Sequence, residues 1–285
     1  SQWSTQPQAL PTEGVPSLVE WWQRFNDPQL TALVSQGLQR NTNVRAAQAA
    51  LQQSRAMRDA KSAGIGPRVG GSASAQTGRS DSNDATDSFQ LGFDASWEPD
   101  VFSGKRSALR AADADLQGAQ ASLAQVQVSM AAEIAVTYIE VRGLQARLAI
   151  ARSNLAAQTE MLQITQWRTQ AGLVSSLDVE QAVAAKEQTA AQIPALSSSL
   201  AQSISSLAVL TGQAPGALQS SLNADSSRTV DVAAAAIPQA PAALAVAIPA
   251  QTLRQRPDIR AAEYRITTAL SQVAQADAAR YPSFQ

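Results

Sequence analysis

The chain has 285 residues without histidine or cysteine, and its 23 acidic and 22 basic residues leave a formal net charge of −1. These counts exclude disulfides, cysteine-based zinc sites and any mechanism that needs histidine, and a near-neutral balance without basic clusters argues against nucleic acid as a partner. Because the sequence also lacks a phosphate-binding glycine loop, we expect no enzyme, no cofactor and no metal site.

The first 66 residues predict an arm followed by a helix. Residues 1–26 are punctuated by prolines, and we interpret them as an extended N-terminal arm. Asp27-Pro28 predicts a helix start, because a carboxylate favours the N-cap and proline favours the first helical position. Apolar residues with helical spacing follow, so we expect one helix across the segment 27–66.

Residues 67–102 change to the two-residue period of a strand, which predicts a β-hairpin. Apolar and polar side chains alternate between Phe89 and Glu98. One predicted face carries Phe89, Leu91, Phe93 and Trp97; the other carries Gln90, Asp94, Ser96 and Glu98. Two strands of about ten residues with one apolar face are typical of a transmembrane β-barrel. The alternation alone also fits a water-soluble hairpin that covers a helix.

Residues 103–212 predict a long helical hairpin. Leucines and other apolar residues repeat every seven positions with one step of four, a stutter that locally unwinds a coiled coil. The first helix would be on the order of 100 Å long at ~1.5 Å per residue. Pro194 lies inside the return helix and predicts a kink there.

The turn of this helical hairpin is the candidate site. It comprises Gly172, Leu173, Val174, Ser175, Ser176, Leu177 and Asp178. Gly172 suits the left-handed position after a helix, and Ser175 with Asp178 fits a capping box. Turn geometry alone explains these residues. It does not explain Leu173 and Val174, because two apolar side chains at an exposed tip suggest a docking surface.

The remaining residues contain a connector and an internal repeat. Residues 213–250 are rich in alanine and proline, and we interpret them as a connector; prolines disqualify Val230–Ala250 as a membrane-spanning helix. Residues 253–282 then align without a gap with residues 38–67, 215 positions earlier. We therefore interpret residues 251–285 as the truncated start of a second large repeat.

The order of elements and several short motifs resemble the outer-membrane factors of tripartite efflux systems, the TolC-like channels, especially the branch that serves RND multidrug pumps. The matching motifs are Trp21-Trp22, Phe25-Asn-Asp-Pro28, Trp97-Glu-Pro-Asp-Val-Phe102, Gly172-Leu-Val-Ser-Ser-Leu-Asp-Val179, Leu207-Ala-Val-Leu-Thr-Gly-Gln213 and Arg256-Pro-Asp-Ile-Arg-Ala-Ala-Glu263. The resemblance covers essentially the whole chain, with the motifs in the order and spacing of the family.

The resemblance implies a homotrimer with a twelve-stranded outer-membrane β-barrel above a tunnel of α-helical hairpins in the periplasm of a Gram-negative bacterium. In this family residues 213–250 would form an equatorial connector, and the tip at 172–178 would meet a periplasmic adaptor that links the channel to an inner-membrane RND-type pump. The implied function is passive export of drugs or other small molecules, in contact with outer-membrane lipid. Members of this branch often begin with a lipidated cysteine, which this sequence lacks, so lipidation is left open.

Two other classes of protein fit parts of the pattern. A periplasmic adaptor also carries a long helical hairpin, but lipoyl-like β-domains flank it rather than strands of this length. A non-enzymatic coiled-coil scaffold explains the heptads and leaves the alternating strands and the 215-residue offset unexplained.

Overall fold

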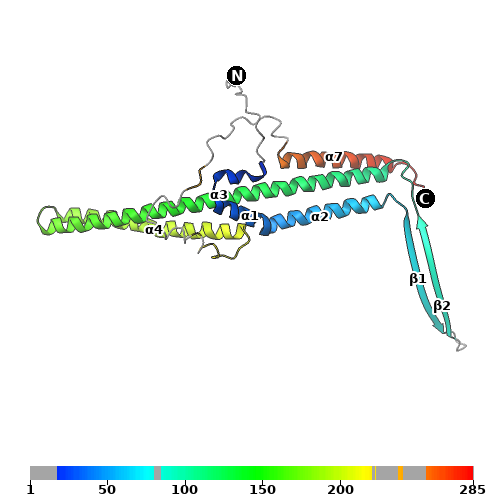
Figure 1. The fold of residues 1–285 in the computed structure, drawn as a ribbon, viewed down its shortest axis with the longest axis horizontal. Helices are drawn as coiled ribbons and strands as arrows, with labels where there is room; N and C mark the ends of the chain where they lie inside the picture. The colour runs from blue at the N-terminus through cyan, green and yellow to red at the C-terminus, as the bar shows by residue number, and fades with distance from the viewer. Residues whose placement is uncertain (1–17, 80–84, 220–221, 223–236, 240–254, 285) are drawn as a thin grey trace, which may run out of the picture. The chain divides into compact units, whose positions relative to one another are not determined.

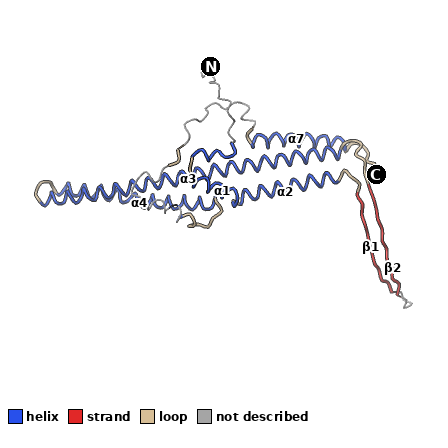
Figure 2. The backbone as a smooth tube through the Cα atoms, viewed as in Figure 1, coloured by secondary structure: helices blue, strands red, loops and turns tan. Residues whose placement is uncertain are grey.

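The computed structural model describes residues 18–79, 85–219, 222, 237–239 and 255–284, which are mostly helical. The elements in chain order are the 3-10 helix η1 (Leu18–Phe25), α1 (Pro28–Arg40), α2 (Thr42–Ala63), β1 (Arg68–Arg79), β2 (Ala85–Ser96), α3 (Gly104–Gln170), α4 (Ser176–Leu210) and α7 (Pro257–Ala278). Figure 2 shows that the described residues are mainly helical and contain one β-hairpin, as expected from the sequence. Most of the arm at 1–26 and of the connector at 213–250 lies outside the described residues.

The chain divides into two compact units. The first comprises residues 1–41 and 128–244, and the second comprises residues 42–127 and 245–285. Helix α3 has 67 residues and contributes to both units.

In the second unit, α2 and α7 both pack against the first part of α3 (Figure 1). Arg58 of α2 donates a 2.9 Å hydrogen bond to Asp113 of α3, and the Thr268 hydroxyl of α7 donates one of 2.8 Å to Asp115. Each of these two helices has 22 residues, and their ends correspond at the offset of the sequence repeat. Small side chains allow the close approach, since a Cβ on Gly118 would lie 3.6 Å from Cβ of Tyr264.

The β-hairpin consists of two antiparallel strands of 12 residues each. Strand β2 begins four residues before the expected Phe89 and ends at Ser96, so Trp97 and Glu98 follow the strand rather than belong to it. Both are held at its base: Trp97 Nε1 donates to the Ile65 carbonyl at 3.1 Å, and Glu98 forms a 3.1 Å ion pair with Lys105.

In the first unit, the single helix expected across 27–66 begins as α1 and is interrupted at Asn41. Asp27 caps α1 as expected, accepting hydrogen bonds from the amides of Gln29 and Leu30 at 2.9 and 3.0 Å. Asn41 leaves the helical region with φ −63° and ψ 135°. Asn41 is buried, and its side-chain amide Nδ2 donates a 2.9 Å hydrogen bond to the Leu210 carbonyl. The spacing of apolar residues does not predict this tertiary contact.

The core of this unit lies where α1, α3 and α4 meet. Its fully buried side chains include Leu30, Val34, Ile134, Tyr138, Val141 and Leu207. At Gly37 of α1 an added Cβ would lie 2.3 Å from Cδ1 of Ile134, so glycine permits the approach of α1 to α3.

Helix α4 continues through Pro194 to Leu210 as one element of 35 residues. By length and composition this helix could cross a membrane, because it contains an 18-residue window of mean hydropathy 1.3, of which 17 % is buried.

Candidate interaction sites

The end of α3 at the hairpin tip is closed by backbone hydrogen bonds. Gly172 has φ +72°, as expected for the left-handed position. Its amide donates to the Thr169 carbonyl at 2.9 Å, and the Leu173 amide donates to the Arg168 carbonyl at 2.9 Å. This pair of bonds is a Schellman motif, which satisfies carbonyls that the helix end would otherwise leave unpaired.

The start of α4 is fixed by one carboxylate. Asp178 accepts hydrogen bonds from the Ser175 hydroxyl at 2.7 Å and the Ser175 amide at 2.8 Å, so the expected capping box is present. These two bonds hold the pKa of Asp178 below its usual range, and the bond from the hydroxyl has the larger effect. Backbone and side-chain hydrogen bonds therefore close the turn at the tip.

Two leucines expose their side chains on this turn. Leu173 is 70 % exposed and Leu177 is 63 % exposed, whereas Val174 is half-buried. Leu173 and Val174 were the expected apolar docking residues, but the turn directs Leu173 and Leu177 to solvent. Trp167, less than two turns before the end of α3, is 58 % exposed and was not among the expected residues.

The strand register places the apolar side chains of both strands on one face. Phe93 pairs with Gly71, Leu91 with Ala73, and Phe89 with Ala75. The three large side chains Phe89, Leu91 and Phe93 are 75–83 % exposed. The ring of Phe93 lies over its glycine partner, since a Cβ on Gly71 would be 3.4 Å from Cε1 of the ring.

The other face of the hairpin is polar. Gln90 pairs with Ser74, and Asp94 pairs with Gly70. Because glycine has no Cβ, it leaves room for the Asp94 carboxylate; a Cβ added to Gly70 would lie 2.7 Å from Oδ1 of Asp94. Ser96 ends the strand opposite Arg68.

A polar network connects α1 to α3 in the first unit. The Tyr138 hydroxyl donates to Asp27, and it accepts a 3.0 Å hydrogen bond from Nε of the buried Arg142. Arg142 also donates to Gln29 and Gln145. Burial raises the pKa of Tyr138 to about 12. Sequence patterns do not predict this network, because it joins residues more than 100 positions apart.

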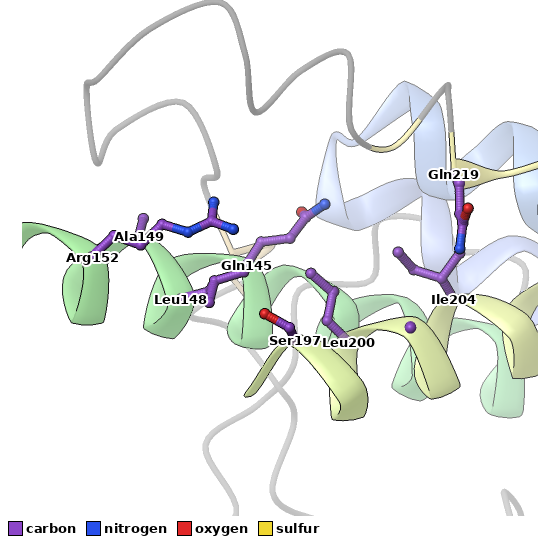
Figure 3. Close-up of a pocket in the computed structure, with 9 residues that line it drawn as sticks. Gln145, Leu148, Ala149, Arg152, Ser197, Leu200, Ile204 and Gln219 are labelled. Carbon is purple, nitrogen blue, oxygen red and sulfur yellow. The ribbon is translucent and has the colours of Figure 1, made fainter. Parts of the chain in front are cut away.

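A hollow of about 380 Å³ lies between α3 and α4 (Figure 3). Its lining residues are Gln145, Leu148, Ala149, Arg152, Ser197, Leu200, Ala201, Ile204 and Gln219. Arg152 is the one charged residue in this lining.

The order of these elements matches a known family. A family model described as outer membrane efflux protein matches residues 33–213, which is more than half of the chain. The chain belongs to the outer membrane efflux protein family. It is therefore an outer-membrane protein that extends into the periplasm, as the sequence resemblance implied.

Curated relatives include a nodulation protein and a pyoverdine export protein. The chain is 30 % identical to nodulation protein T of Rhizobium leguminosarum bv. trifolii, covering 95 % of the chain and 57 % of that relative. It is 28 % identical to the pyoverdine export outer membrane protein OpmQ of Pseudomonas aeruginosa, covering 92 % of the chain and 56 % of that relative. The chain thus spans a little over half the length of these efflux proteins.

Solved channel structures share the fold. The outer-membrane channel OprN superposes with a TM-score of 0.75 at 37 % identity, over 92 % of this chain and 58 % of that one. VceC of Vibrio cholerae superposes with a TM-score of 0.72 at 25 % identity, over 92 % of this chain and 62 % of that one. These likenesses confirm the expected TolC-like class of fold.

Proposed function

We propose that the protein is the outer-membrane exit duct of a tripartite efflux pump, through which small molecules pass without chemical change. The observation that carries this proposal is the β-hairpin with one exposed apolar face. A two-stranded sheet leaves unpaired backbone groups at both edges, and lipid does not tolerate such edges. The strands therefore require completion by further strands into a closed barrel.

The size of the proposed barrel follows from the internal repeat. The chain covers 57 % of the length of nodulation protein T, and α7 begins a second copy of the unit that starts at α2. A second hairpin would give four strands for each subunit. Three subunits would then supply the twelve strands of one barrel, and closed cyclic symmetry leaves no edge unpaired.

The helices support a tunnel wall made of several hairpins. In the first unit, α3 buries Met130, Ile134, Val141 and Leu148 toward its neighbours. On the opposite side of the helix, it exposes several apolar side chains: Val128, Val136, Ile150, Met161 and Ile164. A helix that is apolar on two sides needs a neighbour on each, and we assign the second to an adjacent hairpin of the assembled trimer.

The tip at 172–178 is the proposed docking surface for a periplasmic adaptor. Leu173 and Leu177 project from a turn whose backbone is already satisfied, so they are available for a partner. The adaptor would connect the duct to an inner-membrane RND-type transporter. In this proposal the transporter supplies the energy and selects the cargo.

In this proposal Phe89, Leu91 and Phe93 face lipid, while Gln90, Asp94 and Ser96 face the aqueous lumen. Trp97 and Glu98, which follow the strand, lie at the periplasmic rim. Residues 27–63 and 103–212 form the tunnel wall, and residues 213–250 form the connector around it.

The test combines a cellular and a physical measurement. Deletion of the gene should increase accumulation of a fluorescent efflux substrate, and re-expression of the complete protein should reverse it. The purified complete protein should also conduct ions in planar bilayers with one reproducible unit size. A purified trimer that conducts no ions and restores no efflux would exclude the duct.

A further inference from the structure

Helices α2 and α7 hold equivalent positions in the internal repeat, but they pack against opposite sides of α3. Arg58 of α2 contacts Asp113, whereas Thr268 of α7 contacts Asp115. Residues two positions apart in a helix point roughly 200° away from each other. Figure 1 shows the same order, with α3 between the two shorter helices. The two copies of the short helix therefore reach one long helix from two directions.

Helix α2 faces α3 through one stripe of side chains with helical spacing, the first stripe. Val44 is fully buried, and Arg58 reaches Asp113. The first stripe of α2 consists of Val44, Ala47, Leu51, Ser54 and Arg58. At the offset of 215 positions, the first stripe of α7 consists of Ile259, Ala262, Ile266, Ala269 and Val273. Ile266 and Val273 are 62 % and 60 % exposed, so α7 does not use this stripe to contact α3.

Helix α7 instead contacts α3 through a second stripe. Ala261 and Thr268 are buried, and the Thr268 hydroxyl donates its 2.8 Å hydrogen bond to Asp115. Between them, Cβ of Tyr264 lies 3.6 Å from the position of a Cβ on Gly118. The repeat thus contains two contact surfaces on each short helix, one for each long helix that it meets.

The second stripe of α2 is exposed. Its residues are Ala46, Ala49, Gln53, Met57 and Ala60, of which the first three correspond to Ala261, Tyr264 and Thr268 of α7. Spacings of three and four residues place all five on one side of the helix. Met57 is 57 % exposed.

We propose that the second stripe of α2 binds the long helix of the second repeat in a second copy of this chain. The interface rests on the proposed closed assembly, in which the complete protein contains that second long helix. Within one copy, the second long helix follows α7 and takes its first stripe, as α3 takes the first stripe of α2. It then lies on the far side of α7 from α3, whereas α2 lies on the opposite side of α3. The helix that covers the second stripe of α2 therefore comes from a neighbouring copy.

The side chains of this stripe suit a helix of the same kind as α3. Gln53 takes the place of Thr268, and its side-chain amide can donate a hydrogen bond as the Thr268 hydroxyl does. Ala49 takes the place of Tyr264, and the distance between packed helices depends on the side chains at their contact. We therefore expect the second long helix of the neighbour to approach α2 more closely than α3 approaches α7.

A photocrosslinking amino acid in the complete protein identifies this neighbour directly. Gln53→p-benzoylphenylalanine and Met57→p-benzoylphenylalanine would be made one at a time, and outer membranes of expressing cells would be irradiated. We expect covalent dimers and trimers on denaturing gels, with the crosslink located by mass spectrometry in the long helix of the second repeat. Met57 is already a large exposed side chain, so its variant serves if the change at Gln53 prevents assembly. Gln48 is exposed and belongs to neither stripe, so Gln48→p-benzoylphenylalanine is the matched control and should give no covalent dimer.

The same preparations separate this interface from the proposed duct. Crosslinks that remain within one chain, crosslinks to another protein, or no crosslink in an assembled trimer would overturn the interface. The duct would stand in each of these cases if the complete protein still conducts ions with one unit size. A complete protein that is monomeric in the membrane and conducts no ions would overturn the duct and the interface together.

Discussion

The Tyr138 hydroxyl donates a 2.8 Å hydrogen bond to Oδ2 of Asp27, across 111 positions of sequence. Asp27 uses its other oxygen to cap α1, so one carboxylate both starts this helix and attaches it to α3. Tyr138 in turn supports the buried Arg142. The contact between α1 and α3 therefore includes polar bonds beside an apolar core.

Tyr138→Phe should destabilise the protein without changing its fold. The substitution keeps the ring and leaves Asp27 and Arg142 each without one buried partner, which costs about 1–3 kcal/mol. Urea unfolding of the complete protein measures the loss. Tyr264→Phe is the matched control, because the Tyr264 hydroxyl forms no hydrogen bond within the described residues. Equal midpoints for the two variants would contradict a structural role for the bond.

The same residue predicts a pH dependence on the alkaline side. Burial raises the pKa of Tyr138 from 10.0 to about 12 in the folded protein. A raised folded pKa gives stability that is present below pH 10 and is lost as the pH rises toward about pH 12. Unfolding midpoints measured across this range should fall more steeply for the wild type than for Tyr138→Phe. Parallel curves would show that another group controls the alkaline loss.

Two glycines with the same role should respond differently to alanine. Gly172 and Gly212 end α3 and α4 with φ values of +72° and +68°. A left-handed alanine costs roughly 1–2 kcal/mol at either site. At Gly212 the new Cβ would also lie 2.9 Å from Cβ of Arg40 and 3.1 Å from its carbonyl oxygen, whereas Gly172 has no atom within 4 Å. Gly212→Ala should therefore cost ~1–3 kcal/mol more, measured by thermal or urea unfolding; equal losses would disprove the close contact.

The facing of the strands predicts unequal effects of a positive charge. Phe93→Arg should destabilise the inserted barrel by ~2–4 kcal/mol if Phe93 lies near the middle of the bilayer. Gln90→Arg adds the same side chain on the polar face and should be tolerated. The fraction of protein that folds into vesicles, measured by heat-modifiable gel mobility, compares them. Equal folding yields for Phe93→Arg and Gln90→Arg would contradict the proposal that the face with Phe93 contacts lipid.

The tip predicts a loss of efflux without a loss of folding. Leu173→Asp combined with Leu177→Asp removes both exposed apolar side chains, and an acid at position 177 in the first turn of α4 favours the helix dipole. We expect normal abundance and trimerisation with abolished export. Ser176→Asp places a negative charge at the same turn and keeps both leucines, so it should export normally. Wild-type resistance in the double variant at wild-type abundance would refute the docking role.

Local chemistry made several elements predictable from the sequence. Asp27-Pro28, Gly172 and the pair Ser175 and Asp178 act on backbone groups within five residues, so their motifs predict helix ends correctly. The two-residue period of the hairpin and the repeat that links α2 to α7 are likewise properties of the chain order itself. Together these features were sufficient to suggest the family.

Tertiary structure decided the features that depend on distant residues. The break at Asn41 depends on the Leu210 carbonyl, and the exposure of Leu177 rather than Val174 depends on how the turn directs its side chains. The end of β2 at Ser96 depends on contacts of Trp97 and Glu98 with Ile65 and Lys105. Periodicity predicts which face of an element is apolar. It does not predict which polar groups pair, because a buried polar group must find a hydrogen-bond partner, and that partner can be distant in sequence.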